Sequence, residues 1–403
     1  MKIAIIQNYI RPYSVGGAEI NVEYFARHLA EKGIPTVLIT SGKNLKMEVL
    51  SPHRHLKLYR FYPLNLYFNY PPNVRRNKII KVLWWVLNLW NPFVYLNVRA
   101  ILKREKPNLV NIRNFYGFSP SVFTAAKSLK LPVIFTAHDF FALCKNSSFL
   151  KNETVCQEKC LVCSLWGSWN RIFMKEIKFH FLSEFSAGLY HQYLSPKGLF
   201  IAPNPVYLNE EEIKKNISLR TKMLSERQSI RFIFLGRLSR HKGLMTLLNA
   251  FSKVRCKNAE LLIGGEGEIK KDVEDYVKID PRIKYLGFVK GERKNEALLS
   301  ADVLVLPSEW YEVSPLTIQE AYGFGLPVIG TDLGSIPEHI DTRETGWLFP
   351  YRDLASLARI MDDLCQSKQE IIRRSKACFS RALQNTSLLY IEKVIENYRA
   401  LIL

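Results

Sequence analysis

Short apolar runs separated by helix-forming stretches recur along the first half of the chain. The runs are KIAIIQ, TVLIT, NLVNI and LPVIFTAHD, closed by GLFIAPNPV, and helical patterns such as Ala18 to Lys32 and Pro120 to Leu129 lie between them. Runs that stay apolar throughout are typical of strands buried on both faces of a parallel sheet. The pattern predicts an α/β domain over residues 1–205.

The second half of the chain repeats this pattern. Its runs are RFIFLGRL, AELLIGG, IKYLG, DVLVLP, PVIGTD and GWLFP, and the stretch from Ala355 to the end is helical by pattern. Residues 206–229 are polar without clear periodicity, so we interpret them as a linker. A chain of 403 residues is too long for one doubly wound domain and suits two, the second over residues 230–385.

Charged residues follow two predicted strands of the second domain. Arg237 and Lys242 lie in GRLSRHKG, and Glu312 and Glu320 lie in PSEWYEVSPLTIQEAYGFGLPVIGTD, where Glu309 is interpreted as a loop charge. Ligands of parallel sheets bind at the carboxyl ends of the strands. Cations there suit a diphosphate, and carboxylates suit sugar and ribose hydroxyls. The pattern predicts a sugar-nucleotide site; the alternative is a solvated basic turn beside a charged surface helix.

Further turns carry candidate binding groups. Gly16 and Gly17 follow the first strand, and Gly265 lies in the turn of LLIGGEGE, where glycines let a backbone approach a phosphate or sugar closely. His138 ends the run PVIFTA, where it would orient a sugar hydroxyl or shield positive charge, unless it is a structural histidine. Glu19 would favour the dipole of the first helix.

Three of these turns resemble the retaining glycosyltransferases of family 4, which have the GT-B fold. The resemblance rests on the E-x7-E spacing of Glu312 and Glu320, on the GRL-x3-KG turn, and on the GG-x-E loop at Gly16. It covers nearly the whole chain and is strongest from 230 to 350. It implies two doubly wound, Rossmann-like parallel-sheet domains that face a central cleft, with a C-terminal helix over 386–403 that packs back on the first domain.

The resemblance also implies an activity. The enzyme would move a sugar from a nucleoside-diphosphate sugar to a glycan or lipid-linked acceptor, with retention of configuration, in the synthesis of a cell-surface polysaccharide or glycolipid. Glu312 would receive hydroxyls of the donor sugar and Glu320 those of the ribose, while Arg237 and Lys242 stabilise the leaving diphosphate. Amide hydrogens would meet the phosphates at a helix start formed by Ser314, Pro315, Leu316 and Thr317.

We expect that no side chain of the protein acts as the base that removes the proton from the acceptor hydroxyl. Enzymes of this fold are drawn with front-face attack, in which the leaving phosphate takes the acceptor proton, so His138 would assist catalysis in another way. No Asp-x-Asp motif occurs in the sequence, so neither magnesium nor another catalytic cofactor is implied. One alternative is a sugar-nucleotide epimerase or phosphorylase of the same fold; a phosphorylase would need a site for its pyridoxal cofactor, and none is evident. The other is a nucleic-acid-binding protein, for which no module is visible.

Four cysteines lie in one insert, residues 140–168. Cys144, Cys156, Cys160 and Cys163 have the spacing C-x11-C-x3-C-x2-C. Four thiolates can hold one tetrahedral zinc ion. The odd total of seven cysteines argues against a secreted disulfide framework. A structural zinc is therefore predicted, with an iron–sulfur cluster, disulfides and free thiols as open alternatives.

The net charge of +20 is concentrated in the first half of the chain. Residues 1–205 carry 27 basic and 10 acidic side chains, and residues 51–100 carry eight basic and none acidic. A nucleic acid, an anionic membrane or a pyrophosphate-bearing acceptor would each suit this surface, as would plain solvation. Because the donor motif would be unexplained in a nucleic-acid-binding protein, we expect no nucleic-acid partner.

The segment from Asn73 to Lys106 is the candidate membrane contact. Its tryptophans are Trp84, Trp85 and Trp90, and its flanking cations include Arg75, Arg76, Lys78 and Lys81. Helices at a lipid interface have this composition, and so do helices buried in their own domain. The uncharged stretch Val82 to Val98 is shorter than the about 20 apolar residues of a span, and MKIAIIQNYI is typical of a first strand rather than a signal peptide. We therefore expect a cytoplasmic protein, with peripheral contact with the inner face of a membrane and burial of this segment in its own domain as open alternatives.

Overall fold

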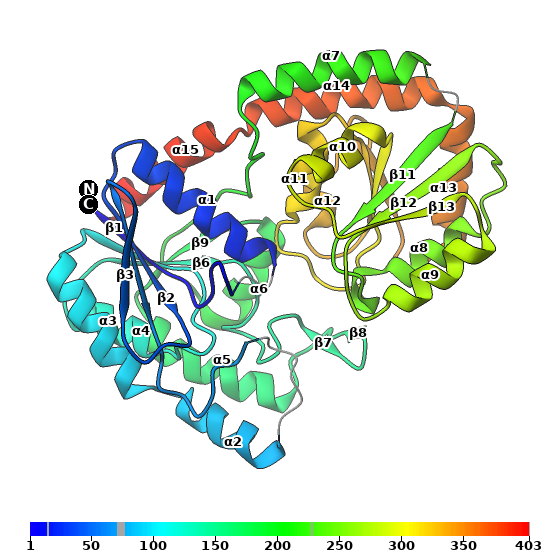
Figure 1. Cartoon of the computed structure of the whole chain (residues 1–403). Helices are drawn as coiled ribbons and strands as arrows, with labels where there is room; N and C mark the ends of the chain where they lie inside the picture. The colour runs from blue at the N-terminus through cyan, green and yellow to red at the C-terminus, as the bar shows by residue number, and fades with distance from the viewer. Residues whose placement is uncertain (14–15, 71–76, 227–228, 403) are drawn as a thin grey trace. The chain divides into compact units, whose positions relative to one another are not determined.

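The computed structural model describes all residues except 14–15, 71–76, 227–228 and 403. The chain forms two compact units. The first comprises Met1–Ser148, Glu158–Ala202 and Ile391–Leu403, and the second comprises Phe149–Gln157 and Pro203–Tyr390. Each unit is built around one large sheet (Figure 1). Arg75 and Arg76 of the candidate membrane contact lie outside the described residues.

In the described residues, the sheet of the first unit has eight strands in the order β10-β9-β6-β5-β1-β2-β4-β3. The strands are β1 (Ile3–Ile6), β2 (Thr36–Ser41), β3 (Glu48–His53), β4 (Leu56–Phe61), β5 (Leu109–Ile112), β6 (Val133–Ala137), β9 (Lys178–Phe181) and β10 (Leu199–Ile201). Neighbouring strands pair in parallel, except that β3 runs antiparallel to β4. The predicted runs form strands here, whereas β3, β4 and β9 are additions to the prediction.

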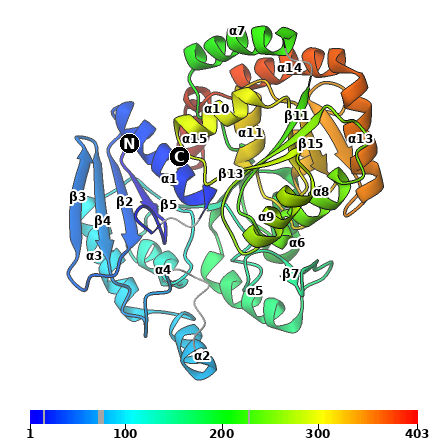
Figure 2. The same cartoon turned by 45° about the vertical axis from the view of Figure 1, so that its right-hand side comes forward.

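The two faces of this sheet meet different helices. Phe135 in β6 contacts Phe123 of α4 (Ser121–Lys127) and Tyr190 of α6 (Glu184–Leu194). The next residue, Thr136, faces the other way, and its Oγ1 lies 3.4 Å from the hydroxyl of Tyr398 in α15 (Ser387–Ile402). This alternation is the ordinary period of a strand. The helix α1 (Gly17–Glu31) lies next to α15 in Figure 1 and Figure 2. The helix α3 (Pro92–Glu105) packs on α4, and α5 (Leu161–Met174) packs on α4 and α6.

In the part of the second unit that is described, the sheet has six parallel strands in the order β13-β12-β11-β14-β15-β16. The strands are β11 (Ile230–Leu235), β12 (Ala259–Gly264), β13 (Ile283–Gly287), β14 (Val303–Leu306), β15 (Val328–Thr331) and β16 (Gly346–Phe349). The chain order reverses between β11 and β14, which is the arrangement of a doubly wound sheet. A separate hairpin of β7 (Leu150–Lys151) and β8 (Thr154–Val155) also belongs to this unit.

Alternate side chains of the second sheet enter two separate cores. Phe232 and Phe234 of β11 join one core, and Ile233 and Leu235 join the other. The first core includes residues of α8 (Leu244–Phe251), α9 (Lys270–Ile279) and α13 (Leu354–Gln366). The second includes residues of α10 (Glu292–Ser300), α11 (Leu316–Gly323), α12 (Ile336–His339) and α14 (Lys368–Gln384). Burial on both faces explains why these strands are mostly apolar, with the charged residues Arg231, Glu260 and Lys284 each at the second position of a strand.

The predicted linker is wrong, because most of residues 206–229 form a helix. The helix α7 (Glu210–Glu226) packs along α14, as Figure 1 and Figure 2 both show. Two of its buried positions are polar: Asn216 Nδ2 donates a hydrogen bond to the carbonyl of Gly323 at 3.0 Å, and Arg220 Nη2 donates to the carbonyl of Asp302 at 2.9 Å. Polar side chains at buried positions interrupt the apolar period, so the helix does not show in the hydrophobic pattern.

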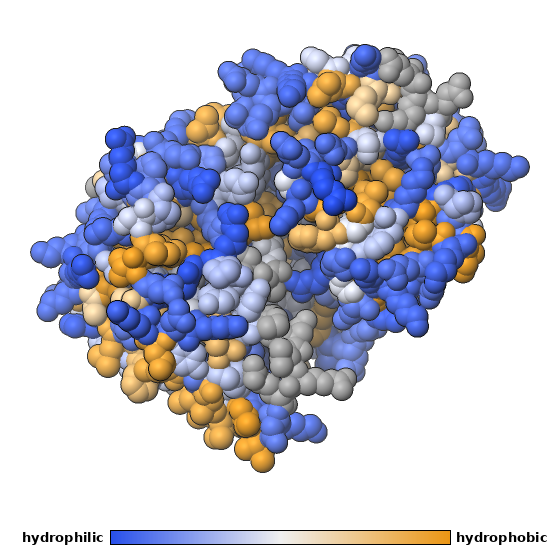
Figure 3. Space-filling view, in the orientation of Figure 1, coloured by the Kyte–Doolittle hydropathy of each residue, from blue (hydrophilic) through white to orange (hydrophobic). Residues whose placement is uncertain are grey.

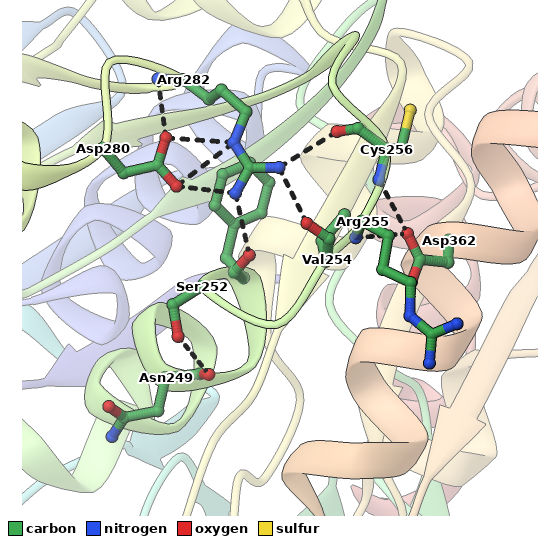
Figure 4. A network of polar contacts seen from close by, with 9 residues as sticks. Asn249, Ser252, Val254, Arg255, Cys256, Asp280, Arg282 and Asp362 are labelled. Carbon is green, nitrogen blue, oxygen red and sulfur yellow. Dashed lines mark hydrogen bonds and ion pairs between the residues drawn. The ribbon is translucent and has the colours of Figure 1, made fainter.

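Arg282 fixes the loop that precedes β12 (Figure 4). Its Nη2 donates to Asp280 Oδ2 at 2.7 Å, and its Nη1 donates to the carbonyls of Val254 and Cys256 at 2.9 and 3.0 Å. Asp362 in α13 accepts the backbone N–H of Cys256 at 3.1 Å. The loop is therefore held from two sides, which positions β12 and the glycine turn at its end.

The tryptophan-rich segment forms two helices, α2 (Lys78–Leu87) and α3. Asn88 Nδ2 donates to the carbonyl of Trp84 at 2.7 Å and ends α2, while Asn91 Oδ1 accepts the N–H of Phe93 at 3.0 Å and begins α3. Among the described residues, no single helix has the length and apolar composition to cross a membrane, and the bent pair of α2 and α3 meets those criteria only when both helices are taken together.

Candidate active site

The turn after β11 holds both predicted phosphate-binding cations. Arg237 is exposed, and Lys242 lies in the short 3-10 helix η1 (Arg240–Lys242). Gly243 ends η1 with φ at +71°, and a Cβ at this position would lie 1.7 Å from the carbonyl oxygen of Pro307. Only glycine therefore lets this turn touch the loop after β14, which carries Glu312.

Glu312 is a buried carboxylate surrounded by donors. Its Oε1 accepts from Lys242 Nζ at 2.7 Å, from Ser308 Oγ at 2.8 Å and from Trp310 Nε1 at 2.8 Å. Burial alone would raise the pKa of Glu312, but the Lys242 ammonium and these hydrogen bonds lower it below its usual value. The group is therefore ionised, and all three hydrogen bonds end on one of its two oxygens. Ser308 and Trp310 are absent from the predicted set.

His241 lies beside the same groups and is also absent from the predicted set. Its ring packs against Trp310 at a centroid distance of 4.9 Å, and its Nε2 lies 3.2 Å from Ser239 Oγ. Burial lowers the pKa of His241, and the neighbouring Lys242 and Arg237 cations lower it further. Both predicted cations thus act on one neutral ring at the carboxyl end of β11.

Glu320, the predicted ribose ligand, pairs with a lysine. It lies in α11, and its Oε1 is 2.5 Å from Nζ of Lys294 in α10. Both side chains are partly exposed. Because Lys294 lies 26 residues earlier in a separate helix, nothing in the E-x7-E spacing indicates this pairing.

The start of α11 fits the predicted phosphate contacts with one correction. Pro315 is the N-cap and has no N–H, so it cannot donate to a phosphate. Ser314 is buried, and its Oγ accepts the N–H of Asn204 at 3.1 Å. Leu316 and Thr317 are the first helical residues and their amides have no partner within the helix. The amides of Leu316 and Thr317 are therefore the donors of this helix that suit a phosphate.

Gly265 contributes a close backbone approach. Its φ is +147°, and a Cβ there would lie 1.8 Å from the carbonyl oxygen of Gly236, while a Cβ at Gly267 would lie 2.2 Å from that of Leu238. The glycine turn after β12 is therefore pressed against the turn after β11, which carries Arg237.

The interpretation of Glu309 as a loop charge is wrong. Its side chain is buried, its Oε1 accepts from Thr246 Oγ1 at 2.6 Å, and its Oε2 accepts from Arg352 Nε at 2.5 Å. The carboxylate joins α8 to the loop after β16. Glu309 thus anchors the loop that also carries Glu312.

Gly16 and Gly17 lie at the start of α1, as the GG-x-E pattern predicts. Glu19 Oε2 accepts the backbone N–H of Gly16 at 2.8 Å, which is one half of a capping box. Glu19 is buried, so it acts through this hydrogen bond in addition to the predicted effect on the helix dipole.

His138 follows β6, as predicted, and lies against a buried arginine. Arg113 Nη1 is 3.1 Å from His138 Nε2 and donates to Asn21 Oδ1 at 2.8 Å, while its Nε donates to Asn111 Oδ1 at 2.8 Å. Burial and the Arg113 cation hold the pKa of His138 well below its usual value. Arg113 directly follows β5, so the strand-end position that indicates His138 also indicates Arg113, although Arg113 is absent from the predicted set.

Asp139 adds a second titratable group at this strand end. Burial raises its pKa to about 7, against the opposing effect of a hydrogen bond from the Phe141 N–H at 2.8 Å. Asn114 Nδ2 donates to its other oxygen at 2.7 Å. The end of β6 therefore presents a neutral imidazole next to a carboxyl that titrates near neutrality.

The four predicted zinc ligands are divided between the two units. Cys156 belongs to the second unit, and Cys144, Cys160 and Cys163 belong to the first. Cys163 Sγ lies 3.6 Å from Cys144 Sγ. In the residues that the structure describes, no three or more His, Cys, Asp or Glu side chains are arranged to hold a metal ion. A zinc site at these cysteines stays a prediction.

Two family models match the chain. The model described as "Glycosyl transferases group 1" matches residues 229–367, and the model described as "Glycosyltransferase Family 4" matches residues 15–154. The chain belongs to glycosyltransferase family 4. Among relatives of this family 4 enzyme, a 42.6 kDa protein in the cps region of Klebsiella pneumoniae is 25% identical over 84% of this chain and 87% of its own length. An amylovoran biosynthesis glycosyltransferase of Erwinia amylovora is 28% identical over 42% of this chain and 43% of its own.

Solved structures give the fold of this family 4 glycosyltransferase. Sucrose-phosphate synthase from Thermosynechococcus elongatus superposes with a TM-score of 0.75 at 17% identity, covering 99% of this chain and 98% of that one. Anabaena HepE in complex with UDP superposes with a TM-score of 0.71 at 16% identity, covering 99% and 100%. The fold is GT-B, with two Rossmann-like units, and the chain is a transferase enzyme.

Proposed function

We propose that this enzyme transfers a sugar, with retention of configuration, from a nucleoside-diphosphate sugar to a glycan or lipid-linked acceptor. The observation that carries the proposal is the environment of Glu312, whose Oε1 is held by Lys242, Ser308 and Trp310 at the carboxyl ends of β11 and β14. A carboxylate fixed in this way can present Oε2, which accepts none of these three hydrogen bonds, to a donor-sugar hydroxyl.

The same end of the second sheet offers groups for the rest of the donor. Arg237 and Lys242 supply two positive charges for the diphosphate, and the amides of Leu316 and Thr317 supply uncharged donors. Glu320 would bind the ribose hydroxyls. The structural neighbour solved with UDP supports a nucleotide as part of the donor.

The chemistry follows from where charge develops. As the bond between the anomeric carbon and the diphosphate oxygen breaks, negative charge grows on the leaving phosphate, and Arg237 and Lys242 stabilise it more in the transition state than in the ground state. The acceptor oxygen bonds to the anomeric carbon on the same face, and its proton passes to the leaving phosphate oxygen. No protein base is required for this step.

The first unit would contribute the acceptor side. Its candidate groups are the Gly16–Gly17 turn and His138, which Arg113 and burial keep neutral and which therefore acts by hydrogen bonding to a sugar hydroxyl. The relatives named for amylovoran biosynthesis and for the cps region support a polysaccharide as the product to which the acceptor leads.

The experiment is release of nucleoside diphosphate in the presence of a panel of sugar donors. Glu312→Gln and Lys242→Met should each lower turnover by about 10²–10³, the usual effect of losing one preorganised contact to a developing charge. Glu274→Gln and Lys271→Met, at exposed positions on α9, serve as matched controls. Full turnover by folded Glu312→Gln and Lys242→Met proteins would refute the donor site.

Product analysis separates the alternatives. A retained anomeric linkage in the product supports the proposal, and an inverted linkage refutes the retaining mechanism. Formation of a sugar phosphate from a glycan and inorganic phosphate would indicate a phosphorylase. Loss of activity on addition of RNA at moderate salt would favour a nucleic-acid partner for the basic first unit.

A further inference from the structure

The helix α2 exposes most of its aliphatic side chains. Its exposed residues are Ile79, Ile80, Val82, Leu83, Val86 and Leu87, of which Ile79 is 70% exposed and Val82 is 61% exposed. In Figure 3, orange atoms gather over α2 at the lower edge of the view. Aliphatic side chains gathered in this way on one helix indicate an interaction site, because soluble proteins rarely leave a large contiguous apolar area exposed.

The tryptophans hold α2 in place and do not form its outer face. Trp84 is buried, stacks on Tyr67 at a centroid distance of 5.7 Å, and donates from Nε1 to the carbonyl of Tyr67 at 3.2 Å. Trp85 meets Trp166 of α5 edge to face at 5.6 Å. The side of α2 that carries Trp84 is therefore fixed to the first unit, which turns the aliphatic residues outward.

The helix α5 extends the exposed apolar area. Trp169 Nε1 donates to the carbonyl of Leu89, just after α2, at 2.9 Å, so α5 lies beside the end of α2. The exposed aliphatic residues of α5 are Leu161, Val162, Leu165 and Ile172, of which Leu161 is 76% exposed. Together these ten residues of α2 and α5 define the α2–α5 surface.

The charged side chains of α2 and α5 are all positive. Lys78 and Lys81 lie on α2, Arg171 lies on α5, and neither helix contains an aspartate or glutamate. Lys145 places its ammonium 4.4 Å from the ring centre of Trp85. Aliphatic side chains with cations and without carboxylates match the boundary between the acyl chains and the anionic headgroups of a bilayer.

A second copy of the chain fits this surface less well. A twofold interface would place the same patch on both partners, so Lys78 and Lys81 of one copy would approach those of the other without carboxylates from α2 or α5 to compensate them. A span by α2 is also excluded by length, since ten residues at about 1.5 Å each cover about half of a hydrocarbon core of about 30 Å.

We propose that the α2–α5 surface docks the first unit on an anionic lipid bilayer. The helix α2 lies in the plane of the interface, with its aliphatic side chains below the headgroups and with Lys78 and Lys81 paired with lipid anions. This inference concerns the first unit alone and does not depend on the donor site of the second unit.

The test is sedimentation with phosphatidylcholine vesicles and with vesicles of equal parts phosphatidylcholine and phosphatidylglycerol. The wild-type protein should bind the anionic vesicles, and binding should fall as salt rises. Ile79→Gln with Leu83→Gln should weaken binding about tenfold or more, since two partly exposed aliphatic side chains no longer enter the apolar layer. Lys78→Glu with Lys81→Glu should weaken binding at low salt by a similar factor.

Matched controls separate the surface from general effects. Ile279→Gln replaces an equally exposed isoleucine, 80% exposed, on α9 of the second unit, and Lys271→Glu reverses an exposed charge on the same helix. Both should bind vesicles like the wild type. UDP affinity and thermal melting show that each variant is folded. Negligible binding of the wild type to anionic vesicles at low salt, or equal binding by the wild type and the Ile79→Gln, Leu83→Gln variant, would overturn the proposal. A vesicle-free dimer that this variant dissolves would assign the surface to a second copy and would also overturn it.

Discussion

Arg113 donates a hydrogen bond from Nη1 to Nε2 of His138 over 3.1 Å. A guanidinium has no acceptor atom and stays protonated, so Nε2 must accept and the proton of the neutral ring must lie on Nδ1. The hydrogen-bonding partners of Arg113 through Nη1 and Nε, His138, Asn21 and Asn111, are uncharged. Arg113 therefore fixes the tautomer of His138 and opposes its protonation at the same time.

Replacing this arginine should change the titration of His138. In Arg113→Met, the pKa of His138 should rise because the neighbouring cation is gone, while burial continues to lower it. Stability should fall by about 1–3 kcal/mol, since the oxygens of Asn21 and Asn111 lose their donor. NMR of the imidazole nitrogens against pH measures the first effect and urea unfolding the second. Arg104→Met, at an exposed position, is the control; an unaltered His138 titration would contradict the assigned contact.

Two glycines with similar backbone angles should respond differently to alanine. Gly243 and Gly287 have φ of +71° and +69°, but a Cβ at Gly243 would lie 1.7 Å from the Pro307 carbonyl oxygen, whereas a Cβ at Gly287 would meet nothing within 4 Å. Gly287→Ala should cost about 1 kcal/mol for the left-handed conformation. Gly243→Ala should cost about 2–4 kcal/mol more and should impair turnover, because it separates the loops of Lys242 and Glu312. Similar unfolding free energies for the two variants would show that the loops tolerate separation.

Lys294 should support nucleotide binding only modestly. It pairs with Glu320 at 2.5 Å, and both side chains are partly exposed, so the interaction is screened by solvent. Lys294→Met should weaken UDP binding by a factor of about 2–5 if Glu320 binds the ribose. Calorimetric titration with UDP measures the change, and Lys290→Met on an exposed loop is the control. A loss of a hundredfold or more would mean that Lys294 itself contacts the nucleotide.

Two buried histidines should make the enzyme less stable in mild acid. Burial lowers the pKa of His180 to about 3 and that of His339 to about 4, from an ordinary value of 6.5. Below pH 6.5 the unfolded chain binds protons that the folded chain does not, so stability falls as pH decreases toward the folded values. The loss should be roughly 1 kcal/mol per histidine for each pH unit. Urea unfolding between about pH 8 and pH 5.5 measures it, and His180→Gln should reduce the slope. His180→Gln and His339→Gln variants with the same pH slope as the wild type would contradict the neutral state of both rings; the comparison with the wild type removes the opposing contribution of Asp139, whose pKa burial raises to about 7.

The cysteines of the insert should differ in reactivity. Burial and the neighbouring Cys144 together raise the pKa of Cys163 to about 12, whereas Cys160 is exposed. At about pH 8, iodoacetamide should modify Cys160 at least about tenfold faster than Cys163, as peptide mapping would show. Metal analysis of the same sample tests the zinc prediction. About one zinc per chain, with Cys144, Cys156, Cys160 and Cys163 all protected, would support the zinc prediction, and no zinc would leave free thiols or disulfides.

The strands could be predicted from the sequence where both faces of the sheet are buried. Every apolar run interpreted as a strand forms one, because strands covered on both faces carry mostly apolar side chains, and their few polar residues, such as Asn111 and Arg231, do not break up the run. The strand β3 lies at the sheet edge, is largely exposed and therefore lacks such a run. The strand β9 is buried but reads KFHF, with a lysine and a histidine. The helix α7 was missed for a related reason, since Asn216 and Arg220 replace apolar residues on its buried side.

From the sequence, only those residues of the candidate site that share a local motif could be predicted. Motif spacing identifies Arg237, Lys242, Glu312 and Glu320, because each lies at a strand end or helix start that the pattern places. Their partners come from other elements: Lys294 from α10 meets Glu320, and Arg113 from the end of β5 meets His138. Such pairs depend on how elements pack, which no local spacing encodes. The sequence likewise does not indicate which face of α2 is buried, because apolar residues occur on all sides of this helix.

The chain passes between the two units four times, after Ser148, Gln157, Ala202 and Tyr390. Neither unit is therefore a single uninterrupted stretch of coding sequence. A truncation after Ala202 would retain Phe149–Gln157 without the unit in which it packs and would lose the C-terminal helix residues that complete the first unit. A recombination event could replace the first unit and keep the second only if it exchanged all three segments of the first unit together. Cys144, Cys160 and Cys163 and the last helix are thus tied to the same inheritance, although more than two hundred positions separate them along the chain.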